Sequence, residues 1–168
     1  MTVKRVHPVE VELPEGRIVV AEFSVEQFPD RNWQLTAVIP GFAPMLVSDG
    51  DLFECLRNLK RKTDPDAIRW LCHGARREAW ASGMLRDMSG ASKVYITKIG
   101  LPTTRSDLVP IFGTAARDAV GTVEEQDSFH HAWLNSLNSQ ERMKDEPPTS
   151  APNGPAQSVP EKTTKLPA

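Results

Sequence analysis

The chain has 168 residues, with 20 basic and 22 acidic side chains and a formal net charge of −2. This length is typical of one domain. The near-neutral balance excludes the basic excess of a general nucleic-acid binder, so we expect no nucleic-acid partner. No stretch approaches the roughly 18 apolar residues of a membrane span, and the first residues lack the apolar run of a secretory signal. The sequence predicts a cytoplasmic protein with no membrane partner, and it leaves the oligomeric state open.

Proline is concentrated at the carboxyl end of the chain. Six of the 14 prolines lie after residue 146, where larger apolar side chains are almost absent. Such a segment cannot bury enough apolar surface to offset the entropy that is lost when it becomes ordered. We expect a single folded domain over residues 1–138 and a disordered, proline-rich tail over residues 139–168.

The first part of the chain has the pattern of β-strands. Val9, Val11 and Leu13 alternate with glutamates, and turn residues at 14–16 lead into an Ile- and Val-rich run at 17–23. This pattern predicts an antiparallel hairpin. Two more apolar runs, 33–39 and 45–47, predict a third strand and a short fourth one.

The segment 48–62 predicts a helix that is capped by Ser48 or Asp49 and ends before Asp64-Pro65. Its apolar residues recur at helical spacing and define a face for the core. That face holds Leu52, Phe53, Leu56 and Leu59, while Arg57, Lys60 and Arg61 are predicted to lie away from it.

The second half is less regular. Residues 76–90 predict a loop with one short helical turn, and residues 93–99 predict a strand. A helix is expected from Asp107, with Pro110 in its first turn, to a stop at Gly121.

A last helix should begin at Thr122-x-x-Glu125, which has the pattern of a capping box. Phe129, Trp133 and Leu137 recur every four residues along it and are expected to pack on the domain. Strands followed by helices indicate an α+β fold, with a mostly antiparallel sheet of four to six strands packed against two or three helices.

The candidate catalytic residues form no established motif. Cys55 and Cys72 are expected to be reduced, buried thiols, and no histidine stands at zinc-ligand spacing from them, so we expect no metal and no cofactor. Cys72 and His73 are neighbours in an extended run, so their side chains point to opposite faces. Ser82-Gly83 lacks the preceding glycine of a nucleophile elbow. An enzyme of unrecognised type that uses Cys72, His73 or Ser82 remains an alternative.

A segment rich in arginine, tryptophan and methionine is the main candidate for partner binding. These residue types are enriched at protein interfaces. The candidate residues are Arg76, Arg77, Trp80, Met84 and Arg86. The alternatives are an anionic ligand, or a core role for the tryptophans with the arginines paired to Glu78 and Asp87.

The acidic start of the last helix, at Glu124 and Glu125, is a second candidate surface for a basic partner. Acidic residues in a first helical turn also stabilise the helix dipole without any partner. The sequence does not separate these two roles.

Three short segments resemble a pattern found in bacterial immunity proteins that are encoded beside polymorphic toxins of the Rhs, contact-dependent or type VI secretion type. The segments are Cys72-x-Gly74-Ala75-Arg76, Ser82-Gly83-Met84, and Lys93-x-Tyr95 before Gly100. The resemblance covers about 30 residues. It implies a protein that binds and occludes one cognate protein toxin without catalysis. An adaptor in a larger bacterial assembly, tethered through the proline-rich tail, is a further alternative.

Overall fold

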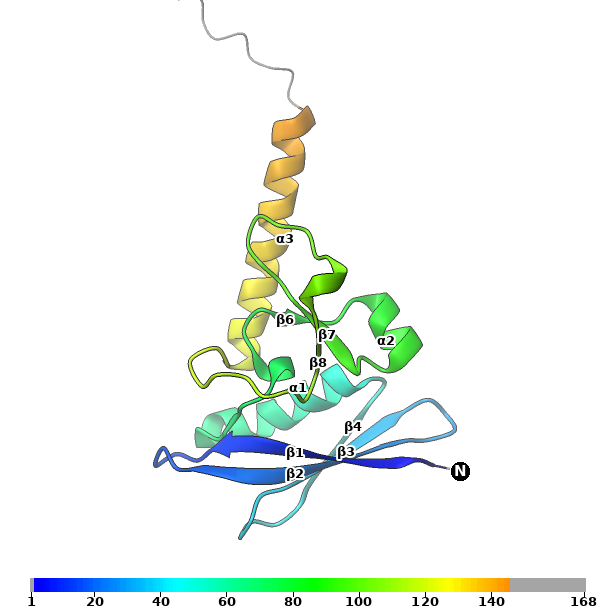
Figure 1. Cartoon of the computed structure of the whole chain (residues 1–168), viewed down its shortest axis with the longest axis vertical. Helices are drawn as coiled ribbons and strands as arrows, with labels where there is room; N and C mark the ends of the chain where they lie inside the picture. Colours follow the sequence, from blue (N-terminus) through cyan, green and yellow to red (C-terminus); the bar gives the residue numbers. More distant parts are fainter. Residues whose placement is uncertain (1, 146–168) are drawn as a thin grey trace, which may run out of the picture.

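The larger of two antiparallel sheets forms the base of the molecule in the computed structural model, which describes residues 2–145 (Figure 1). Its strands follow the order β4-β3-β2-β1-β5. They are β1 (Lys4–Glu12), β2 (Ile18–Gln27), β3 (Trp33–Val38), β4 (Met45–Asp49) and β5 (Arg69–Trp70). The predicted hairpin and the two strands after it are confirmed, because alternate apolar residues of each strand fill the inner face of this sheet.

Helix α1 (Leu52–Thr63) packs on that inner face. Its four predicted core residues are all buried. The predicted cap at Ser48 or Asp49 is wrong, since Asp49 ends β4 and its carboxylate bonds the Gly50 amide and Asn58. Asp51 is the cap instead, and it accepts a hydrogen bond from the Glu54 amide at 2.9 Å.

The second sheet, with the order β6-β7-β8, lies on the other side of α1 (Figure 1). It consists of β6 (Ala79–Trp80), β7 (Lys93–Ile96) and β8 (Leu108–Pro110). The short helix α2 (Gly83–Ser89) precedes β7, which confirms the expected helical turn in this loop. Three 3-10 turns cover Asp64–Asp66, His73–Ala75 and Arg105–Asp107. The α+β class, the antiparallel pairing and the number of helices agree with the prediction.

The helix predicted from Asp107 to Gly121 is wrong. Asp107 is the last residue of a single 3-10 turn that Thr104 caps, and Pro110 pairs with Lys93 at the edge of the second sheet, where a missing amide proton costs little. Beyond it, the Ile111 amide donates to the Ser92 carbonyl and the Ala115 amide donates to the Leu71 carbonyl. These long-range hydrogen bonds hold the segment in turns and short bridges despite its helical apolar spacing.

Helix α3 (Val123–Asp145) begins at the predicted capping box. The Glu125 amide donates to Thr122 Oγ1 at 3.1 Å, and the Thr122 amide donates to a Glu125 oxygen at 3.3 Å. Gln126 is wholly buried, and its Nε2 donates to the carbonyls of Gly74 and Arg76 at 2.8 and 2.9 Å. This side chain fixes the start of α3 to the middle of the chain.

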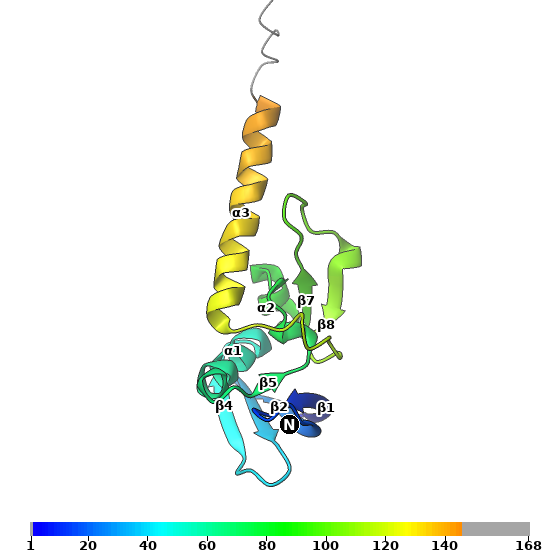
Figure 2. The ribbon, with the colours of Figure 1, turned by 90° about the vertical axis from the view of Figure 1, so that its left-hand side faces the viewer.

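The far half of α3 extends past the second sheet (Figure 2). Phe129, Trp133 and Leu137 are half-buried along it, as expected for a packing face. The helix continues past Asn138 to Asp145, so a disordered tail from residue 139 is wrong for residues 139–145, which contain no proline. The rest of the predicted tail, 146–168, lies outside the described residues. Within residues 2–145, no helix combines the length and the apolar character needed to cross a membrane.

Two charged residues of α1 differ from their predicted exposure. Arg57 and Lys60 were expected to point away from the core, yet they are only 5% and 2% exposed. The cause is the position of α1 between the large sheet and the later part of the chain, with β5, the turn His73–Ala75 and α3 in contact with it. Arg61 is exposed as predicted, with 47% of its side chain accessible.

Candidate functional site

The first two arginines of the predicted contact surface bond to neighbouring parts of the chain. Arg76 Nε donates to Glu78 at 3.4 Å, as the core alternative expected. The guanidinium of Arg77 donates to the Val120 carbonyl at 3.2 Å and to the Asp118 carbonyl at 2.6 Å. Arg77 therefore helps to hold the loop that leads into α3, while the Arg76 side chain pairs within its own segment.

Trp80 and Arg86 lie in a half-buried cluster of aromatic and charged side chains. The Trp80 ring stacks on His130 with centroids 3.6 Å apart and planes 9° apart. Arg86 Nη1 lies 3.2 Å from both Asp51 and Glu54, and its guanidinium carbon is 5.7 Å from the Trp80 ring centroid. These contacts tie α2, α1 and α3 together.

The remaining predicted contact residues are more accessible. Met84 on α2 is 71% exposed, and its neighbour Met88 is 81% exposed. Glu124 and Glu125 are exposed in the first turn of α3, where Glu125 completes the capping box and lies 3.7 Å from Arg77. Of the predicted surface, Trp80, Met84 and Glu124 have no side-chain hydrogen bond or ion pair inside residues 2–145, and Trp80 is held by ring contacts instead.

The candidate nucleophiles are engaged in the fold. Burial raises the pKa of the Cys72 thiol to about 12, and Cys55 behaves in the same way, so both are protonated at neutral pH. Both cysteines are reduced and buried, as predicted. Ser82 Oγ accepts from the Leu85 amide at 3.3 Å as the cap of α2. Burial lowers the pKa of His73, and its Nδ1 has no partner among the described residues.

Arg57 is the best-partnered buried cation of the molecule's interior. Its Nη1 lies 3.3 Å from Glu54, and its Nη2 pairs with Asp127 of α3. The guanidinium carbon is 5.7 Å from the Phe53 ring centroid and 5.3 Å from that of Trp80. Two carboxylates and two ring faces thus replace the water that burial removed around the two terminal nitrogens, while Nε has no partner among the described residues.

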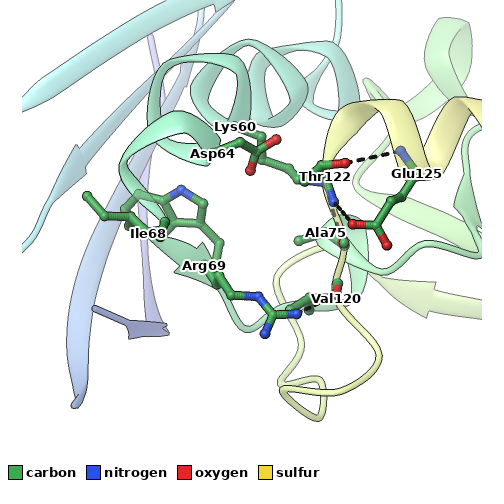
Figure 3. A pocket seen from close by; sticks show the side chains of 11 residues that line it. Lys60, Asp64, Ile68, Arg69, Ala75, Val120, Thr122 and Glu125 are labelled. Atoms are coloured by element: carbon green, nitrogen blue, oxygen red, sulfur yellow. Dashed lines mark hydrogen bonds between the residues drawn. The ribbon is translucent and has the colours of Figure 1, made fainter. Parts of the chain in front are cut away.

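Lys60, one helical turn further along α1, lies in the wall of a pocket of about 240 Å³ (Figure 3). Its Nζ donates to the Ala75 carbonyl at 3.5 Å, the outer limit for a hydrogen bond. Among residues 2–145, it forms no ion pair within 4.0 Å. Burial lowers its pKa to about 8, although Asp64 partly offsets that effect. Burial also raises the pKa of Asp64, whose carboxylate accepts from the Val123 amide at 3.2 Å.

A second, larger hollow of about 1090 Å³ forms a groove at the open end of the large sheet. Its floor includes Arg5 and His7 of β1, and its opposite wall includes Met88 of α2 and Phe112 after β8. The His7 and Phe112 rings are 5.1 Å apart. The groove therefore lies between the beginning of β1 and the segment after β8, which touch through these two rings.

Beside this groove, β1 has an unpaired edge. Strand β5 pairs only with Val11 and Glu12, and the Leu71 amide donates to the Glu10 carbonyl. Backbone polar groups of alternate residues point to the same side of a strand. The backbone carbonyl of Glu10 points away from β2. The backbone polar groups of Lys4, Val6 and Pro8 therefore point away from β2 as well. The described residues place no other backbone against these groups.

Sequence reasoning missed the groove edge and the pocket at Lys60. Pro8, inside an otherwise alternating strand, was a usable signal, because proline occurs almost only in edge strands. Lys60 had no comparable signal, since its burial depends on segments 15 to 65 residues further along the chain.

The chain matches no known protein-family model and no curated protein.

Proposed function

We propose that this protein is an immunity protein that binds one cognate bacterial toxin and neutralises it by occlusion, without catalysis. The proposal commits to one mode of contact, in which an extended segment of the toxin occupies the groove and adds a strand beside β1. The observation that carries it is the unpaired backbone edge of β1 along a groove of about 1090 Å³. The resemblance to immunity proteins supplies the class of partner.

Backbone geometry supports this mode of binding. An added strand gains affinity from main-chain hydrogen bonds, and pockets for alternate side chains give specificity. The outward amide and carbonyl of Val6, and the outward carbonyls of Lys4 and Pro8, supply the hydrogen bonds. Arg5 and His7 alternate with them and line the groove, where they meet the side chains of the added segment.

The walls of the groove suit a protein segment. Trp33 and Phe112 provide aromatic surface, and Met88 provides an exposed, adaptable apolar contact at the rim. Among the charged residues of the lining, Arg5 and Arg31 form no ion pair within the described chain, so an acidic side chain of the toxin would find partners there. The proposed contact surface thus shifts from the loop at Arg76 toward the groove.

Co-expression with the product of the neighbouring gene tests the function. We expect the folded chain to restore growth and to co-purify with that product at a fixed ratio. A folded chain that neither restores growth nor co-purifies would rule out the immunity function.

A pair of substitutions at one position tests the mode of contact. Val6→Pro removes an amide on the unpaired edge of β1 but not one that bonds β2, so the fold should persist, as it does with Pro8 in the same register. Val6→Thr keeps the amide and changes only the exposed side chain. We expect loss of toxin binding in the first variant and its retention in the second. Equal binding by two folded variants would reject strand addition while leaving occlusion intact.

A further inference from the structure

The pocket at Lys60 shares no lining residue with the groove, so it is a separate candidate site for a ligand. We propose that this pocket binds a small carboxylate with a short apolar tail, whose oxygens accept hydrogen bonds from Lys60 Nζ. The pocket is defined by Lys60, Asp64, Arg69, Trp70, Ala75 and Thr122. The inference does not depend on the proposed toxin.

The unsatisfied ammonium group is the primary observation. Lys60 is 2% exposed, and an ammonium has three donors. One of them reaches the Ala75 carbonyl at 3.5 Å, and no second hydrogen bond is formed within residues 2–145. A buried charge with so few partners is costly, and it points to an acceptor that arrives from outside the chain.

The hydrogen-bonding groups around the pocket favour an anionic acceptor over a donor. Asp64 is used by the Val123 amide, and Glu125 is used by the Thr122 amide and lies near Arg77. Free donors remain on Arg69, which gives only its Nη2 to the Val120 carbonyl at 2.8 Å, and only an acceptor can engage them together with Lys60 Nζ. Figure 3 shows Lys60 and Arg69 at opposite walls, and the chain that enters α3 lies between them.

The direction of α3 adds to this preference. The chain at Val120–Thr122 lines the pocket, and the helix that starts at Val123 runs for 23 residues. The positive end of its dipole therefore lies at the pocket and favours a negative charge there. The helix end alone would not define a site, but here it acts together with the buried ammonium.

The size and the walls of the pocket limit the ligand. At about 30 Å³ per water molecule, 240 Å³ corresponds to about eight waters. Ile68, Trp70, Ala75 and Val120 supply apolar walls. A carboxylate with three or four further carbon atoms fits this volume. For a ligand of this size, we expect a dissociation constant on the order of 1 mM.

Titration of the full-length, ¹⁵N-labelled chain with sodium butyrate tests the site. We expect saturable amide shifts at residues 64–70, 75 and 120–125. Butyramide has nearly the same shape but no charge, and it should bind at least tenfold more weakly. Sodium chloride at equal ionic strength should produce no saturable shift. Equal binding of butyrate and butyramide, or no saturation with butyrate, would overturn the proposal.

Two variants on α1 make the test specific. Lys60→Met should lose butyrate binding and raise the melting temperature of the ligand-free protein, because a chain of similar shape replaces an unsatisfied charge. Arg61→Met, on the exposed side of the same helix, should keep both properties. A Lys60→Met protein that still binds butyrate, or that melts below the wild type, would show that Lys60 has only a structural role.

Discussion

Arg57 and Lys60 are two buried cations on one helix, and their surroundings are opposite. Arg57 has two carboxylates and two aromatic rings around its guanidinium, whereas Lys60 has one carbonyl at 3.5 Å. Both lost their water when α3 and the turn at His73–Ala75 covered α1. A buried charge with several hydrogen-bond and ion-pair partners stabilises the fold. A buried charge with few partners keeps donors that a ligand can satisfy.

Removal of Arg57 should give the largest effect. Arg57→Met leaves Glu54 and Asp127 facing a buried apolar chain, and breaking a buried pair typically costs 3–5 kcal/mol. Asp127 keeps 46% of its side chain exposed, so we expect a loss of about 3 kcal/mol in the free energy of unfolding. Urea denaturation measures it. Arg61→Met is the matched control and should stay within about 0.5 kcal/mol of the wild type; a similar loss in both would make Arg57 an ordinary surface charge.

The effect of Lys60→Met should have the opposite sign and should depend on pH. We expect it to increase the free energy of unfolding by about 2 kcal/mol at pH 7. The pKa of Lys60 is lowered by burial to about 8, while the unfolded chain keeps its proton to about 10.5. Between these values the unfolded state binds more protons, so wild-type stability rises relative to the variant. The advantage of Lys60→Met should be complete below pH 8 and vanish toward pH 10.5.

Other charged and titratable groups lie near Lys60 and also affect its pKa. Asp64 and Glu125 raise its pKa and Arg57 lowers it, and all three remain in the variant. The pKa values of the buried thiols Cys55 and Cys72 are raised to about 12, and loss of Lys60 raises that of Cys72 further, so both thiols stay protonated in the two folded proteins. Urea denaturation at pH 7, 9 and 10.5 gives the difference. A constant advantage at all three values would mean that the Lys60 pKa is unshifted.

Double-mutant cycles should give the smallest effects and compare the two sites directly. Lys60→Met combined with Asp64→Asn should show a coupling energy of about 0.5 kcal/mol, because no ion pair within 4.0 Å joins these residues. The cycle of Arg57→Met with Asp127→Asn should exceed 1 kcal/mol. In Asp64→Asn, the side chain keeps an oxygen that can accept a hydrogen bond from the Val123 amide, so the start of α3 should stay in place. Equal coupling energies would remove the distinction between the two cations.

The sequence predicted structure best where local pattern and tertiary contacts agree. The strands β1 to β4, the apolar face of α1 and the capping box of α3 follow from alternation, helical spacing and Thr122-x-x-Glu125. The helix expected after Asp107 is absent because Ser92 and Leu71, distant in sequence, bond this segment in a form made of turns and short bridges. Local spacing carries no information about such partners.

In the candidate site, too, some features follow from the local sequence and others from contacts between distant parts of the chain. The Arg/Trp/Met segment was recognisable from composition, but its hydrogen bonds to Val120, Asp118 and Glu78 depend on the folded chain. The burial of Arg57 and Lys60 was not predictable from α1, whose charged residues have ordinary amphipathic spacing. It requires knowledge of what covers the second face of the helix. The edge of β1, by contrast, was encoded locally by Pro8.

The attachment of α3 through Gln126 has a consequence for the order of assembly during synthesis. The large sheet and α1 emerge from the ribosome before the residues that cover Arg57 and Lys60. At 5–20 residues per second, the roughly 66 residues from Lys60 to Gln126 take about 3–13 s to add. During this interval α3, which carries Asp127 and Gln126, is not yet present to cover α1. Enclosure of charge is therefore a late step of folding, completed when Gln126 reaches the carbonyls of Gly74 and Arg76.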